Sequence, residues 1–131
     1  MSVDIPDGDV VVVRVPAVGA YVATLRLTAA SLAARCDLTI DDIEDLRLAV
    51  DEACALLLPH ANANATLDAR FVLTNGCLAV TTSVASVDEA SPDRTGFAWS
   101  VLCALASDVN VDGAPGQLAI TVTKRREAPT P

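Results

Sequence analysis

The chain has 131 residues, of which 52% are hydrophobic and only 3% aromatic, so it predicts one domain with an aliphatic core. A net charge of −8 argues against direct nucleic-acid binding, because contact with phosphates needs a basic surface. The N-terminus does not resemble a signal peptide, and no apolar run reaches membrane-spanning length. We therefore expect a cytoplasmic protein with no membrane segment.

The cysteines indicate a reduced chain without a zinc site. Four are present (Cys36, Cys54, Cys77 and Cys103), none in a Cys-x-x-Cys pair, and His60 is the only histidine. Cys54 and Cys103 fall within helical apolar patterns, so both are expected to be buried as small hydrophobic residues.

The first third of the chain predicts a strand and a helix. Residues 1–9 are polar and predict a flexible tail. The β-branched run VVVVRV at 10–15 predicts a strand that Pro16 closes. Residues 19–35 predict a helix, whose apolar stripe would consist of Tyr21, Val22, Leu25, Ala29 and Leu32.

A long central helix is predicted over residues 39–58. Thr39 can cap its start together with Asp42, three residues on, in a carboxylate form of the capping box. Pro59 ends it by removing a backbone donor. Midway along the helix lies an acidic pair, Asp51 and Glu52, among residues that otherwise favour burial.

The rest of the chain predicts three strands and one helix. The expected segments are strands at 66–73, 78–84 and 117–123, a helix at 96–109, a polar loop at 86–95 and a turn at 112–116. Asn75-Gly76 between the first two strands is a strong hairpin signal. The apolar stripe of the last helix would be Phe97, Val101, Leu102, Leu105 and Val109. Trp99 fits either core packing or an exposed contact with a partner.

The predicted order is β-α-α-β-β-α-β. Helices with one apolar side must cover a sheet, so we expect an α/β (α+β) fold, a two-layer sandwich. Its mixed, mainly antiparallel sheet would be covered on one face by about three helices. The expected single domain spans residues 10–126, between flexible tails at 1–9 and 127–131.

Three segments carry a resemblance to a known family. They are DLRLAVDEACALLLPHA at 45–61, GFAWSVLCALASDV at 96–109 and LAITVTKRR at 118–126. With the order of elements, they resemble the GHKL (histidine kinase-like, Bergerat-type) ATPases, and within them the RsbW-type anti-sigma factors and serine-protein kinases. The resemblance implies a dimeric bacterial regulator of transcription in the stress response that binds an alternative sigma factor. Many such proteins also use Mg²⁺ and ATP to phosphorylate a serine of an anti-anti-sigma (STAS-type) partner.

The resemblance implies a catalytic acid but not a metal site. The family's central helix carries Glu-x-x-x-Asn, in which the acid serves the chemistry and the Asn ligates Mg²⁺. Here the acid is Glu52, and the Asn position is Leu56, which has no oxygen for a hard cation. Glu52 is thus the candidate catalytic residue, with a solvated helix acid as the alternative, and no metal ligand is assigned. Leu56 reads most simply as an additional core residue.

The nucleotide motifs are also altered. The adenine-binding Asp-x-Gly-x-Gly of the family is absent, and the nearby acids Asp88 and Asp93 lack its glycine spacing. The family's Gly-x-Gly-Leu appears as Gly96-Phe97-Ala98-Trp99. Gly96 and Asp93 remain the candidate cofactor-binding residues, and a plain helix start is the alternative for Gly96. These departures predict impaired binding of Mg²⁺-ATP.

Three functions stay open. The first is an anti-sigma factor that sequesters an alternative sigma factor by protein–protein interaction, with a basic partner matched to the acidic surface. The second is an ATP-dependent serine kinase that uses Glu52. The third is a scaffold that keeps the fold and docks to another regulator.

Overall fold

The computed structural model describes residues 8–87 and 90–126. The elements along the chain are β1 (Asp9–Pro16), η1 (Gly19–Tyr21), α1 (Val22–Arg35), α2 (Ile40–Leu57), η2 (Leu58–His60), β2 (Thr66–Thr74), β3 (Cys77–Ala85), α3 (Phe97–Leu105), β4 (Asp108–Ala114) and β5 (Gln117–Arg125). Among these residues, no helix is both long and apolar enough to cross a membrane.

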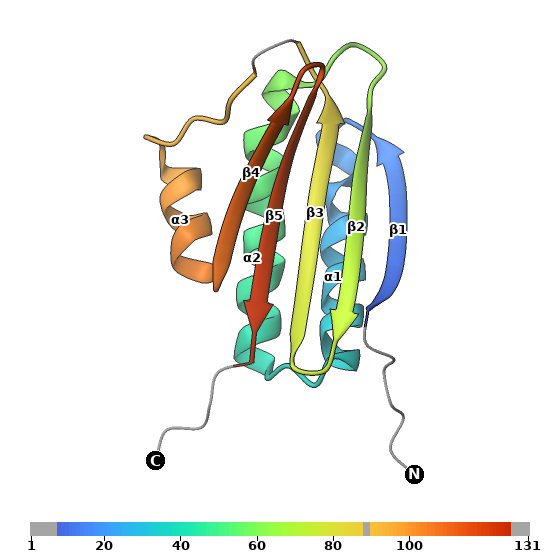
Figure 1. Ribbon diagram of the computed structural model, residues 1–131, viewed down its shortest axis with the longest axis vertical. Coiled ribbons are helices and arrows are strands. Elements are labelled where there is room, and N and C mark those ends of the chain that lie inside the picture. Colours follow the sequence, from blue (N-terminus) through green and yellow to red (C-terminus); the bar gives the residue numbers. More distant parts are fainter. Residues whose placement is uncertain (1–7, 88–89, 127–131) are drawn as a thin grey trace.

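The five strands form one sheet in the order β1-β2-β3-β5-β4 (Figure 1). Each pair of neighbours is antiparallel. The prediction of a mainly antiparallel sheet is therefore confirmed, but the prediction that it is mixed was wrong, because no parallel pair occurs among the described strands. The β2–β3 hairpin turns at the predicted Asn75-Gly76, where Gly76 takes a φ of 77°. This left-handed conformation favours glycine.

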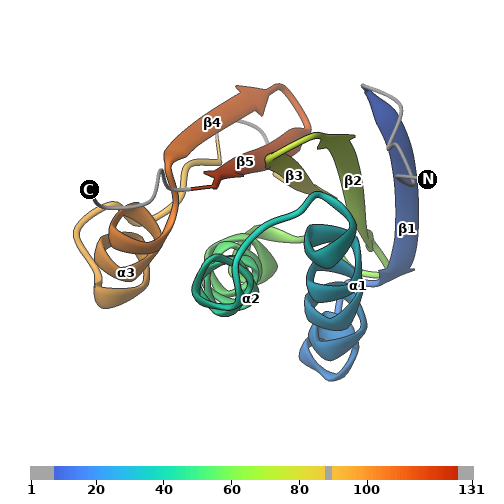
Figure 2. The ribbon, with the colours of Figure 1, turned by 90° about the horizontal axis from the view of Figure 1, so that it is seen from below.

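The three α-helices lie on one face of the sheet, which gives the predicted two-layer sandwich (Figure 2). α1 and α2 pack side by side under β2, β3 and β5, and α3 packs beside α2. The core is aliphatic, as predicted from the low aromatic content; Phe71 is its largest fully buried side chain. Core positions alternate along β2, β3 and β5, because successive strand residues point to opposite faces.

The first strand starts slightly earlier than predicted. β1 begins at Asp9, and the amide of Gly8 donates to the carbonyl of Leu73 at 2.9 Å. The end of the expected tail at 1–9 is thus paired with β2. The other tail residues, 1–7 and 127–131, lie outside the described part of the chain.

The predicted helix at 96–109 was wrong at its C-terminal end. α3 ends at Leu105, and Ala106 is already extended, with a ψ of 150°. The segment predicted to be the end of a helix and a turn is instead strand β4, paired with β5 from Asp108 to Ala114. The turn is limited to Pro115 and Gly116. Pairing of 108–114 with β5 satisfies the backbone groups along the outer edge of β5, which one more helical turn would leave without partners.

Several residues assigned to apolar helix faces are exposed. Phe97 is 81% exposed, and Tyr21, which lies in η1, is 44% exposed. Cys103 is also exposed, whereas Cys54 is buried as predicted. α3 uses a narrower face, with Leu102 fully buried and Trp99 partly buried against the core. The reason is its position at the margin of the helical layer, where it has a helix on one side only.

Candidate functional site

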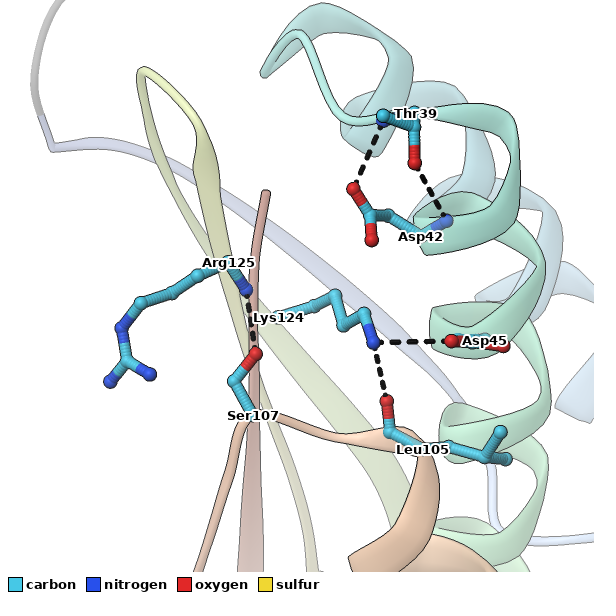
Figure 3. Close-up of polar contacts among 7 residues, drawn as sticks. All are labelled: Thr39, Asp42, Asp45, Leu105, Ser107, Lys124 and Arg125. Carbon is cyan, nitrogen blue, oxygen red and sulfur yellow. Dashed lines mark hydrogen bonds and ion pairs between the residues drawn. The ribbon is translucent and has the colours of Figure 1, made fainter. Parts of the chain in front are cut away.

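The start of the central helix α2 is fixed by the predicted capping box. The amide of Asp42 donates to Thr39 Oγ1 at 3.1 Å, and the amide of Thr39 donates to Asp42 Oδ2 at 3.2 Å (Figure 3). Asp42 is 3% exposed, and its carboxylate satisfies a backbone donor that the helix leaves free. The capping box therefore sets where α2 begins, and with it the direction of every later side chain.

Asp51, the first member of the acidic pair, joins α2 to α1. Arg26 Nη1 donates to both carboxylate oxygens of Asp51, at 2.9 and 3.0 Å. Both side chains are about one third exposed. Asp51 thus serves an ion pair between helices rather than standing as a free surface charge.

Glu52 lies on the side of α2 that faces α3. Asp45 lies on that side of α2, because its carboxylate contacts Lys124, and Lys124 also contacts Leu105, the last residue of α3 (Figure 3). Residues seven and eleven positions after Asp45 return to nearly the same side of a helix, and these are Glu52 and Leu56. Glu52 is partly exposed, whereas Leu56 is 7% exposed and belongs to the core. The reading of Leu56 as a core residue therefore agrees with its position.

The two other candidate residues, Asp93 and Gly96, lie together at the start of α3. Asp93 Oδ1 accepts hydrogen bonds from Thr95 Oγ1 at 2.7 Å and from the Thr95 amide at 2.9 Å. These bonds, with a backbone contribution from Gly96, lower the pKa of Asp93 below its usual value. Asp93 is exposed, so this carboxylate is a surface anion that organises its own loop.

Gly96 is the N-cap residue of α3 and has an ordinary extended conformation, with a φ of −87°. A Cβ atom at Gly96 would lie 3.1 Å from Asp93 Oδ2. The glycine therefore leaves room for the Asp93 turn. Next to it, the Arg94 guanidinium lies 5.3 Å from the centre of the Trp99 ring, a cation–π contact. Trp99 therefore makes this contact while it also packs against the core.

The side chains on the α3 side of α2 provide too few oxygen ligands for a magnesium ion. Mg²⁺ needs several oxygen ligands in octahedral geometry. On the α3 side of α2, Glu52 offers a carboxylate, but Leu56 one turn later offers none and is packed into the core. Within residues 8–87 and 90–126, no group of three or more potential metal ligands comes together. Asp88, the other acid noted in the sequence, lies outside the described residues.

Sequence reasoning missed Lys124. The run Lys124-Arg125-Arg126 attracts attention only as a short basic segment, yet each of its side chains pairs with an acid, namely Asp45, Asp108 and Asp37. A signal for Lys124 existed in the alternation of β5, whose buried positions are 118, 120, 122 and 124. Strand alternation would have placed the lysine among the core-facing residues.

Comparison with known proteins agrees with this geometry. Residues 15–124 match the family described as histidine kinase-like ATPase domain. Over 48 residues the chain is 46% identical to the serine-protein kinase RsbW of Bacillus thuringiensis, and over 53 residues it is 45% identical to that of Bacillus velezensis. These stretches cover 37% and 40% of this chain but only 30% and 33% of the relatives.

A solved structure shows the same fold. It contains the RsbU and RsbW domains of Rv1364c from Mycobacterium tuberculosis and superimposes with a TM-score of 0.68 and 17% sequence identity. The superposition covers 92% of this chain and 33% of the larger protein. Since the family match spans most of the chain, from within β1 to near the end of β5, this protein belongs to the histidine kinase-like ATPase domain family.

Proposed function

We propose that this domain is an anti-sigma factor, which binds an alternative sigma factor and keeps it from RNA polymerase. The observation that carries the proposal is the similarity to RsbW proteins within a chain of the histidine kinase-like ATPase family. The curated relatives are about three times as long as the matched stretch, so their activity is transferred here as a hypothesis.

The charge of the chain supports a basic partner. The formal net charge is −8, and sigma factors carry basic surfaces for DNA. Opposite charges speed the encounter of two proteins and help to select the correct partner. Association would therefore weaken and slow as the salt concentration rises.

The test is direct binding with purified proteins. Each alternative sigma factor of the same genome is titrated with the domain by calorimetry, with and without Mg²⁺-ATP, and the primary sigma factor serves as the control. We expect at least one alternative sigma factor to bind with a Kd of about 1 μM or tighter, a free energy near −8 kcal/mol. Competition with core RNA polymerase should follow. Failure of every sigma factor to bind at micromolar concentration would remove the proposal.

The second candidate function is a serine kinase acting on an anti-anti-sigma (STAS-type) protein. Two observations favour it: the relatives are named serine-protein kinases, and Glu52 is a partly exposed acid on the α3 side of α2. The buried Leu56 opposes it, because the metal would lack a ligand there. If the kinase exists, transfer of labelled phosphate from ATP to the partner serine is abolished in Glu52→Gln. In Asp51→Asn, which alters the Arg26 pair, some activity should remain.

We also propose a cytoplasmic homodimer, built from the single domain at 10–126, that uses the open face of the sheet. Within the described residues, no element covers this face (Figure 2). On β1 it presents Val10 and Val12, 46% and 60% exposed, and beyond β2, where Arg70 is the neighbour of Val12, it presents the paired hydroxyls of Thr81 and Thr121. A two-fold dimer buries the same patch on both copies, so one substitution acts twice.

Analytical ultracentrifugation tests the surface. Val12→Asp should produce monomers, whereas Leu27→Asp, on helix α1 and 61% exposed, should leave the mass unchanged. A dimer that survives Val12→Asp, or a wild type that is monomeric at every concentration, would contradict this surface.

If neither a sigma factor, nor a nucleotide, nor a STAS protein binds, the third function, a scaffold that docks to another regulator, remains.

A further inference from the structure

Lys124 is a buried cation that the proposed activities do not use. It lies in β5 on the side that faces the helices and is only 5% exposed. A buried ammonium group is costly unless charged or polar partners surround it. Its surroundings should therefore reveal what it does.

The ammonium group joins three elements. Lys124 Nζ donates to Asp45 Oδ2 on α2 at 3.2 Å and to the carbonyl oxygen of Leu105 at 2.8 Å (Figure 3). Leu105 is the last residue of α3. We call these three residues the Lys124 cluster; it connects β5 to α2 and to the C-terminal end of α3.

The contact with Leu105 is favourable for a general reason. The last carbonyl groups of a helix have no partner within the helix, and the helix dipole makes this end negative. Lys124 supplies both a donor and a positive charge at that point. Ser107, two residues after Leu105, is also hydrogen-bonded to β5, because its amide donates to the Thr123 carbonyl at 2.9 Å and its Oγ accepts from the Arg125 amide at 3.0 Å.

α3 depends on such ties more than the other helices do. It has nine residues, and Leu102 is its only fully buried side chain. Helices this short are not stable on their own, so tertiary contacts decide whether they form. A charge-assisted hydrogen bond at the helix end is one of the few strong contacts available to α3.

We propose that Lys124 is a positioning residue that holds α3 against α2. It fixes the C-terminal end of α3 and thereby sets where the other end, with Gly96, lies relative to the side of α2 that carries Glu52. The positioning role of Lys124 follows from the fold. The further statement that the position of α3 serves binding of a partner or a nucleotide rests on the proposed function.

Hydrogen exchange followed by mass spectrometry tests the proposal. The variants are Lys124→Met, which keeps most of the side-chain length but removes the charge, and Asp45→Asn, which leaves the Leu105 contact in place. Arg125→Met is the matched control, since Arg125 is the next residue, loses the same charge and pairs with the exposed Asp108. Peptides covering 97–105 report on α3, and peptides covering 67–84 report on the sheet.

In Lys124→Met, exchange in α3 should accelerate by roughly tenfold or more beyond any change in the sheet, because a hydrogen bond to a charged group is worth at least that factor. Asp45→Asn should give a smaller acceleration in α3, and Arg125→Met none. Equal acceleration in α3 and the sheet would show a general loss of stability and overturn the proposal, as would unchanged exchange in α3. Should Lys124→Met fail to fold, the comparison of Asp45→Asn with Arg125→Met decides. None of these outcomes depends on sigma-factor binding, so the proposed function can fail separately.

Discussion

The buried thiol of Cys54 should make the stability of the protein fall at alkaline pH. Burial, and secondly the negative charge of Asp51, raise the pKa of Cys54 from 9.0 to about 12. In the unfolded chain the thiol loses its proton near pH 9, while the folded protein retains it. The contribution of Cys54 to stability is therefore complete below pH 9 and is lost as the pH rises toward 12. At about 1.36 kcal/mol per pH unit, the loss is about 3 kcal/mol at pH 11.

The assay is urea unfolding of the wild type and Cys54→Ala between pH 8 and 11. Other groups titrate in the same range, but the difference between the two proteins isolates Cys54. At pH 8 the variant should be the less stable, because it leaves a small cavity. The difference should shrink with rising pH and reverse near pH 11. Cys103→Ala is the control: its thiol is exposed, so its unfolding should parallel the wild type throughout. A constant difference between wild type and Cys54→Ala from pH 8 to 11 would refute the reasoning.

Three further substitutions test the helices by urea unfolding. Thr39→Ala removes the oxygen that accepts from the Asp42 amide and should cost about 1 kcal/mol; no measurable cost would mean that the capping box does not form in solution. Leu102→Ala removes the only fully buried side chain of α3 and should cost about 2 to 4 kcal/mol, and a cost below about 1 kcal/mol would show that α3 is not packed as described. Gly96→Ala should cost less than about 1 kcal/mol, because the group it approaches is the end of the exposed Asp93 side chain, which can move; a larger loss would mean that the backbone itself needs glycine there.

The sequence was sufficient where a single physical signal dominated. β-branched residues closed by Pro16 predicted β1, Thr39 and Asp42 predicted the start of α2, and Asn75-Gly76 predicted the β2–β3 hairpin. Each of these signals is local, and the backbone has no better alternative nearby. The family resemblance was carried by three other segments, at 45–61, 96–109 and 118–126, and the family match over residues 15–124 bears it out.

The sequence misled where two periodicities compete. Leu105 and Val109 are four residues apart, as in a helix, but Val109 and Val111 alternate, as in a strand. The strand wins because β5 provides a hydrogen-bonding partner for residues 108–114, and no single-segment pattern contains that partner. The same limit applies to Lys124: its burial depends on Asp45, 79 positions away, and on the end of a helix whose length was itself misjudged.

The two proposed functions make different demands on the α3 side of α2. Binding a protein partner needs a stable surface, whereas phosphate transfer also needs oxygen atoms arranged around a metal and a nucleotide. Of the three residues on this side, Asp45 is engaged with Lys124, and Leu56 is part of the core. Both therefore stabilise the packing of the domain. Among the described residues on the α3 side of α2, only Glu52 has a carboxylate that is not engaged with Lys124. With a single such carboxylate, and with a leucine where an oxygen ligand would be needed, this side of α2 offers too few ligands for the metal that phosphate transfer requires. For this reason the kinase stands second to sigma-factor binding, which rests on the similarity to RsbW proteins.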